Sequence, residues 1–313
     1  MASRTSALEG QVTERKSSGL WRDAFGRLIK NRLAIVGGVI VLFLIFIAVF
    51  GPFIAPYKYY DQNISLVASC GNRPCPPFTP GHLLGTDKLG RDLLSRMMDG
   101  AQISMTVALV VQAVVILIGI PVGALAGWFG GRVDNILMRI TDVVYAFPDL
   151  LFIIILTVAF KETWFGKALD GLFLVFVAIG IVSWITMARL VRGQLLSLKE
   201  TEFVEAARAI GVSDRRIVTR HLLPNAIGPV IVAITLGIPA AILAEATLAF
   251  IGIGANIPRA SWGTLIQDGV KYLRSDPHLA IFPAIAIALA LLSFTFLGDG
   301  LRDALDPKLR GKQ

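Results

Sequence analysis

The sequence predicts an all-α membrane protein with six transmembrane helices. Of its 313 residues, 55% are hydrophobic and only 17% are charged, with a mean hydropathy of +0.68. Five stretches of 18 to 32 residues contain no Asp, Glu, Lys or Arg, and about 20 apolar residues suffice for a helix to cross a bilayer. These stretches lack the alternation of a membrane β-strand. The composition excludes a soluble domain and a disordered chain.

The expected spans follow the gaps between charged residues. They lie near residues 33–55, 102–127, 139–160, 171–191, 227–251 and 279–299. The third span is interrupted only by Asp149, which follows Pro148. Proline can bend a helix and frees a backbone carbonyl, so we expect Asp149 to serve helix packing rather than substrate contact.

Positive charge predicts how these spans are oriented. With six crossings both termini share a side, and that side carries 20 Lys and Arg residues against 10 on the other. The positive-inside rule therefore places both termini in the cytoplasm, with the chain as a multi-pass membrane protein. The same rule explains the net charge of +8, so no nucleic-acid partner is expected.

The first 55 residues divide into three parts. Residues 1–19 are polar and are expected to be a disordered cytoplasmic N-terminus. Residues 20–32 have an amphipathic pattern typical of an interfacial helix, with a cytoplasmic extension of the first span as the alternative. Residues 33–55 are the first transmembrane helix, because their apolar region is too long for a cleaved signal peptide.

Residues 56–100 are expected to form an external loop. Its last part, after Asp87, has an apolar stripe that predicts an interfacial helix leading into the second span. Cys70 and Cys75 are the only cysteines, and outside the cell a disulfide between them is favoured over free thiols. With His82 they supply too few ligands for a zinc site, so no metal site is predicted.

The longest inner loop, at 193–225, has the pattern of two short helices joined by a bend. Thr201 is a suitable N-cap and Gly211 a suitable stop for the first helix. Ser213 can cap the second, which would begin at Asp214 and end before Pro224. Such a compact unit suits docking into a groove on a partner, although a plain amphipathic connector shows a similar spacing.

This loop resembles the EAA loop of ATP-binding-cassette (ABC) importer permeases, because Glu205-Ala206-Ala207, Gly211 and Leu223-Pro224 occur in the same order. His221 stands where the general pattern has isoleucine. Three further motifs strengthen the resemblance; they are Gly85-Thr86-Asp87 with Gly90-Arg91-Asp92, Gly130-Gly131 with Asp134-Asn135, and the segment from Gly298 to Pro307. Together they are most similar to the second permease subunit of bacterial dipeptide and oligopeptide importers.

The resemblance implies a type I ABC importer permease fold in the plasma (inner) membrane of a bacterium, with a core domain at 101–300 and a cytoplasmic tail at 301–313. It also implies a sister permease, two ABC ATPase subunits and an external substrate-binding protein as partners. The chain has no GxxxxGK[ST] phosphate loop, so ATP and Mg are expected on the ATPase subunits and no cofactor on this chain. The residues assigned to the ATPase-coupling loop are Glu202, Glu205, Ala206, Ala207, Gly211, Ser213, Asp214, Leu223 and Pro224.

Two further features of the spans bear on function. Gly119, Gly123 and Gly127 share one helix face and predict close helix packing, within the chain or against the sister permease. Glu245 is costly inside a membrane, so it is the candidate for the translocation path, which it would line or brace. A protonated Glu245, or one bonded to a neighbouring helix, is the alternative.

The expected function is a non-catalytic permease subunit for di- or oligopeptides that couples the motion of partner ATPases to alternating access. Related permeases for nickel or another small solute are an alternative within the same class. A different class is an ion-coupled secondary transporter or channel, in which Glu245 and Asp149 would be the working charges. An intramembrane enzyme is disfavoured because the sequence has neither HExxH nor GxSxG, so no catalytic residue is assigned.

Overall fold

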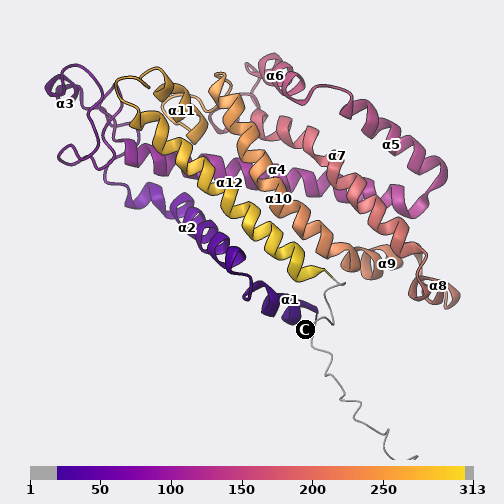
Figure 1. Cartoon of the computed structure of the whole chain (residues 1–313). Coiled ribbons are helices and arrows are strands. Elements are labelled where there is room, and N and C mark those ends of the chain that lie inside the picture. The colour runs from indigo at the N-terminus through magenta and orange to yellow at the C-terminus, as the bar shows by residue number, and fades with distance from the viewer. Residues whose placement is uncertain (1–19, 307–313) are drawn as a thin grey trace, which may run out of the picture.

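The computed structural model of the chain describes residues 20–306, and every regular element in that part is a helix (Figure 1). Apart from the helices it contains two isolated β-bridges, Thr79 with His82 and Thr86 with Asp92. The expected all-α class is therefore confirmed. The segment 1–19, expected to be disordered, and the end of the expected tail, 307–313, lie outside the described residues.

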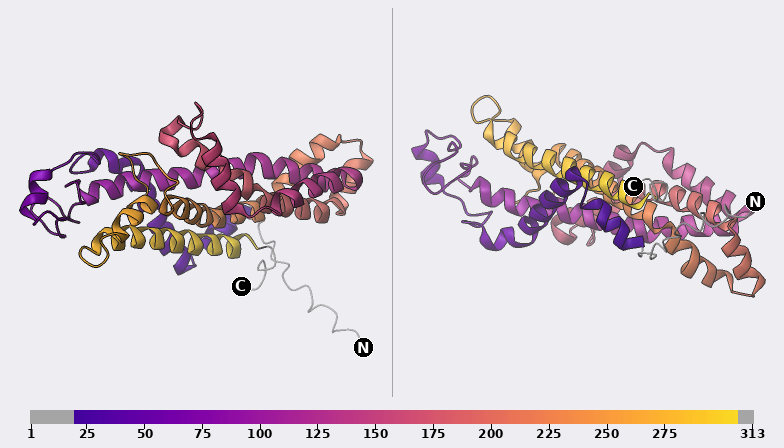
Figure 2. Two further views of the ribbon diagram at one scale, coloured as in Figure 1. Left: turned by 90° about the horizontal axis from the view of Figure 1, so that it is seen from above. Right: turned by 60° about the horizontal axis from the view of Figure 1, so that its bottom comes forward.

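Five helices in the described part are long and apolar enough to cross a membrane. They are α2 (Arg32–Ile54), α4 (Leu93–Phe129), α7 (Leu172–Lys199), α10 (Leu223–Phe250) and α12 (His278–Leu305). They run along one long axis and give the molecule an elongated shape (Figure 2). Four of the five contain an internal proline yet continue past it.

The third expected span, 139–160, is not one helix. It is divided between α5 (Gly131–Tyr145) and α6 (Asp149–Phe160), which meet at an angle of 81°. Pro148 has an extended backbone, and a proline both removes a helix hydrogen bond and disfavours helix at the residue before it. The sixth crossing exists only if this bent pair is counted as one span. Asp149 is exposed at the start of α6, so the packing role expected for it is not seen within the chain.

Helices α4 and α7 form the tightest pair, and the glycine stripe is their contact. A Cβ atom added at Gly119 would lie 2.7 Å from the Met187 Cβ, and one at Gly127 would lie 2.9 Å from the Arg192 carbonyl oxygen. A Cβ at Gly123 would meet the Ala188 carbonyl oxygen. Of the two packing alternatives, the stripe therefore faces α7 of the same chain, where small residues allow the backbones to approach closely.

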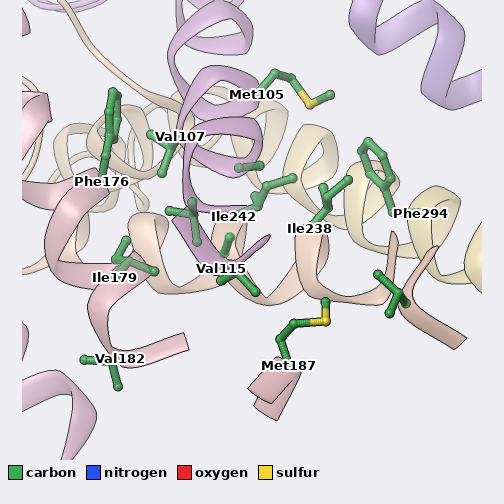
Figure 3. Packing of buried hydrophobic residues seen from close by; sticks show 14 of the residues in the cluster. Met105, Val107, Val115, Phe176, Ile179, Val182, Met187, Ile238, Ile242 and Phe294 are labelled. Atoms are coloured by element: carbon green, nitrogen blue, oxygen red, sulfur yellow. The ribbon is translucent and has the colours of Figure 1, made fainter. Parts of the chain in front are cut away.

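The core lies where α4, α7, α10 and α12 meet. Figure 3 shows side chains from all four helices pointing toward one another; among those labelled are Val107, Val115, Ile179, Met187, Ile238, Ile242 and Phe294. Helix α2 packs beside α4 and α12 on the flank of this core. In contrast, large apolar side chains on the outer faces of α2, α5 and α6 are exposed, as expected of surfaces that meet lipid or other membrane helices.

The first and last residues of the described chain lie together at one end of the molecule. Helix α1 (Leu20–Leu28) is separate from α2, because the chain turns at residues 29–31 and the Asn31 side chain caps α2 by accepting from the Leu33 and Ala34 amides. The Arg27 guanidinium donates to the Asp306 carbonyl oxygen at 3.3 Å. Helix α1 and the last turn of α12 therefore lie side by side (Figure 1).

The opposite end contains α3 (Ile64–Ser69), α11 (Trp262–Val270) and the loops around them (Figure 1). A separate interfacial helix before the second span, expected after Asp87, is absent from this described region. Helix α4 itself begins at Leu93, because the Asp92 carboxylate accepts from the Ser95 amide at 2.7 Å and caps it. Of the apolar stripe expected in that helix, Leu93, Leu94, Met97 and Met98 lie in the first two turns of α4, whereas Leu89 lies in the turn before it.

Candidate functional site

Four of the residues assigned to the coupling loop by the sequence form part of a short helix, α8 (Glu202–Ala209), at the end of the molecule remote from α3 (Figure 1). They are Glu202, Glu205, Ala206 and Ala207. Thr201 has the extended backbone of an N-cap, but its hydroxyl donates to the Leu198 carbonyl oxygen at 2.6 Å and does not cap α8. Glu202 and Glu205 occupy the first turn, where negative charge complements the helix dipole.

Gly211 ends α8 as expected. Its φ of +79° is left-handed, its amide donates to the Arg208 carbonyl oxygen, and the Val212 amide donates to the Ala207 carbonyl oxygen. This pair of bonds is the Schellman arrangement, in which glycine avoids the steric cost of a left-handed residue. A Cβ at Gly211 would meet no atom within 4 Å, so the glycine is required by backbone conformation and not by space.

The second short helix differs from the expectation. Helix α9 (Asp214–Ile217) follows Ser213 but does not stop before Pro224; it passes through a π-helical turn, η2 (Val218–Leu222), directly into α10. Pro224 lies in the first turn of α10, directly after this π-helical turn. Residues 214–250 thus form one uninterrupted helical segment that joins the loop to a membrane span.

Helix α8 has one face buried in its own chain and one face exposed. Val204 is fully buried and Ala207 is 8% exposed, whereas Ala206 is exposed. Phe203 and Ile210 are 41% and 81% exposed, on the same side as Ala206. The residues assigned to coupling are therefore not equivalent. Those at the surface are Glu202, Glu205, Ala206, Gly211, Ser213, Asp214 and Pro224, while Leu223 is half-buried.

Trp128, near the C-terminal end of α4, holds α8 through a cation–π contact with Arg208. The Arg208 guanidinium lies over its ring at 4.9 Å from the centroid, and the Lys199 ammonium lies at 5.7 Å. The Lys199 ammonium also donates to the Trp128 carbonyl oxygen at 2.8 Å. Cations over an aromatic face are attracted by its negative potential. This anchor, missed in the sequence, joins α8 to α4 in addition to its covalent links.

Two ion pairs attach α5 to α7 near the same end. The Arg192 guanidinium donates to both oxygens of Asp134, at 2.5 and 2.6 Å, and the Arg189 guanidinium donates to Asp142 at 2.7 Å. Arg189 also lies over the Tyr145 ring. The bidentate pair has the stronger and more directional geometry. Asp134 belongs to one of the motifs noted in the sequence, and its role here is to hold α5 against α7.

Glu245 lies inside the helix bundle. It is 1% exposed, and its carboxylate accepts from the Ser104 hydroxyl of α4 at 3.3 Å. The Ser104 hydroxyl also accepts from the Trp262 amide at the start of α11. Glu245 therefore connects α10 to α4 and to the neighbourhood of α11. Among the alternatives for this residue, contact with a neighbouring helix is the arrangement observed within the chain.

The α3 end is held by a compact polar network and a disulfide. Cys70 and Cys75 are bonded, with Cα atoms 5.5 Å apart. Asp87 accepts from Arg91 Nε at 2.6 Å and from Arg96 at 2.7 Å, and Asp92 contacts His82 Nδ1 at 2.9 Å. In residues 20–306 no three His, Cys, Asp or Glu side chains gather as metal ligands would.

Comparison with known proteins matches most of the chain to one kind of membrane protein. Residues 119–311 match the model of the family described as binding-protein-dependent transport system inner membrane component. Residues 19–74 match that of the N-terminal TM domain of oligopeptide transport permease C. Together the two models include α2, α7, α8, α10 and α12 and the last part of α4.

Individual relatives agree along nearly the full length. The oligopeptide transport system permease protein OppC of Bacillus subtilis is 41% identical over 96% of this chain and 94% of its own. The dipeptide transport system permease protein DppC of the same organism is 42% identical over 96% and 90%. Among solved structures, the inward-facing MetNI methionine ABC transporter matches with a TM-score of 0.56, 20% identity, and coverage of 67% of this chain and 96% of that one. This structural likeness concerns the fold alone.

Proposed function

The chain belongs to the family of binding-protein-dependent transport system inner membrane components, and we propose that it carries short peptides and receives the motion of a partner ATPase through α8. It is a non-catalytic permease subunit of an ABC importer. Peptide cargo is supported by relatives named for oligopeptide and dipeptide transport. A relative named for glutathione transport, 38% identical, makes a related small solute the alternative cargo.

The proposed assembly contains a sister permease, two ABC ATPases that bind ATP and Mg, and an external substrate-binding protein. This chain would bind no cofactor. The exposed apolar faces of α5 and α6 supply surface for another membrane subunit. The proposed orientation places α1, α8 and the end of α12 in the cytoplasm and α3 and α11 outside, because the α8 end then carries the larger share of Lys and Arg.

The observation that supports coupling best is that one face of α8 is exposed, while the other face packs against the rest of the chain. Its exposed face combines Phe203, Ala206 and Ile210 with acidic residues in the first turn, as suits insertion into a groove. Its buried face packs on the chain, and Arg208 lies over Trp128 of α4. Because residues 214–250 are continuous, displacement of α8 would move α4 and α10 together.

Glu245 would brace this arrangement. A buried carboxyl group that accepts a hydrogen bond from α4 fixes the register of α10 against α4. We therefore expect Glu245→Gln to retain import and Glu245→Leu to impair both assembly and import.

Site-specific crosslinking tests the proposal. Cysteine placed at Ala206 should crosslink to the ATPase subunit from the cytoplasmic side, whereas cysteine at Asp61, in the loop before α3, should not. ATP-driven uptake of a labelled tripeptide by the reconstituted complex tests the cargo. Crosslinking at Asp61 in place of Ala206 would overturn the orientation and the coupling role together, and failure of peptide uptake would overturn the cargo.

A further inference from the structure

A partly open cavity of about 660 Å³ lies near the α3 end. Its walls come from the turn before α4, the C-terminal end of α6 and the segment 252–259 between α10 and α11. Its volume falls within the range of about 300–1,000 Å³ typical of small-molecule sites. Apolar side chains such as Val158, Leu174 and Ile253 line part of it. None of the sequence motifs predicted this space, and the coupling role of α8 does not use it.

Charged side chains at this cavity are unbalanced. Six cations line it, against two acids; the cations are Lys88, Arg91, Arg96, Lys161, Lys167 and Arg259, and the acids are Glu162 and Asp268. Most of the cations are neutralised locally. Arg91 and Arg96 contact Asp87, Arg259 contacts Asp99, and Lys167 contacts Glu162.

Two cations remain. Lys88 lies in the turn before α4 and Lys161 caps the C-terminal end of α6; both are exposed, and neither forms an ion pair within residues 20–306. A concave surface lined by excess charge of one sign concentrates the potential inside it. An ammonium group on a flexible stem is well suited to meet a carboxylate that arrives in varied poses.

We propose that this cavity receives the carboxylate of a short peptide, with Lys88 and Lys161 as its two binding cations. The inference depends on the proposed peptide cargo and names the cargo group that this chain recognises. A free C-terminal carboxylate is common to unmodified peptides of any sequence, so two lysines can bind it without reading side chains. The apolar part of the wall then accommodates neighbouring side chains of varied size.

Direct binding to the reconstituted complex tests the inference. The full chain with its partner subunits is placed in nanodiscs without the substrate-binding protein. Binding of fluorescently labelled trialanine with a free carboxylate is then compared with binding of its C-terminal amide. Lys88→Gln with Lys161→Gln should weaken binding of the free acid about tenfold and leave the amide unchanged. Lys58→Gln, an external lysine outside the cavity, is the matched control and should change neither.

Salt provides a second readout. The preference of the wild-type complex for the acid over the amide should shrink as ionic strength rises, because exposed charges are screened. Equal binding of acid and amide by the wild type, or equal losses for both in the double variant, would overturn the inference. So would unchanged binding of the free acid by the double variant. These outcomes are distinct from failure of ATP-driven peptide uptake, which would overturn the cargo itself.

Discussion

A cluster of charged side chains is buried and paired at the α3 end of the molecule, whereas the charged side chains of α8 at the other end are exposed. At the α3 end the buried Asp87 forms ion pairs with the buried Arg91 and Arg96. At the α8 end Glu202 and Glu205 are exposed beside exposed apolar side chains. The first end keeps its shape with contacts from its own chain. The second leaves acidic and apolar side chains exposed, which is what the proposed docking role requires.

The largest effect should come from breaking the buried network at the α3 end. Asp87→Ala leaves the guanidinium groups of Arg91 and Arg96 without their shared carboxylate, and unpairing a buried charge typically costs about 3–5 kcal/mol. Thermal unfolding of the purified chain in detergent measures the loss. Asp61→Ala, at an exposed site in the same region, should stay within about 0.5 kcal/mol. Comparable losses at both sites would show that the network is not the frame described.

The next effect concerns the helix pair that joins the two ends. Gly123→Ala forces a Cβ against the Ala188 carbonyl oxygen and to 2.8 Å from the Val191 Cβ, and such overpacking typically costs about 1–3 kcal/mol. Gly193→Ala is the control, because a Cβ there meets no atom within 4 Å. The control should be neutral or slightly stabilising, since alanine favours helix over glycine. A destabilised Gly193→Ala variant would contradict this account.

Two adjacent alanines of α8, one buried and one exposed, allow its two faces to be tested separately. Ala207→Trp forces a large ring into the buried face and should destabilise the chain by about 1–3 kcal/mol. Ala206→Trp lies on the exposed face and should leave unfolding within about 0.5 kcal/mol of wild type. In the complex, however, Ala206→Trp should reduce import at least tenfold while ATP hydrolysis continues. Import and ATPase assays measure the coupling, and unchanged import would remove the docking role of this face.

The smallest effect should follow loss of the cation over Trp128. Arg208→Gln removes an interaction worth about 0.5–1 kcal/mol at a partly exposed site. Stability should fall by no more than that amount, and import should fall a few-fold relative to ATP hydrolysis. Arg216→Gln, which removes an exposed cation on α9, should change neither quantity. Equal effects of the two substitutions would mean that overall charge, and not the anchor, matters.

The spans and the stop at Gly211 could be predicted from sequence because each depends on local chemistry. Long gaps between charged residues are enough to locate apolar helices. A glycine after a run of helix formers is enough to end one. The face shared by Gly119, Gly123 and Gly127 follows from helix geometry alone, but its partner could not be chosen until α7 was seen beside it.

A bend at Pro148 could be expected from the sequence, but its size and the anchor at Trp128 depend on distant contacts and could not. Pro121, Pro239 and Pro283 lie inside continuous helices, whereas Pro148 coincides with a bend of 81°. Residue type alone does not separate these cases, because neighbouring helices decide whether the freed backbone groups are satisfied. The anchor at Trp128 likewise joins residues far apart in the chain, and no spacing rule places Arg208 over its ring.

The uninterrupted helical segment from Asp214 to Phe250 has a mechanical consequence. At about 1.5 Å per residue, Asp214 and Glu245 are separated by roughly 47 Å along the axis. If the segment pivots as a stiff rod near Asp214, a tilt of about 5° carries the level of Glu245 sideways by roughly 4 Å over that length. A displacement of that size matches the width of a small side chain. A small tilt that begins at the α8 end of the segment would thus displace the helix at the level of Glu245 by about the width of a side chain.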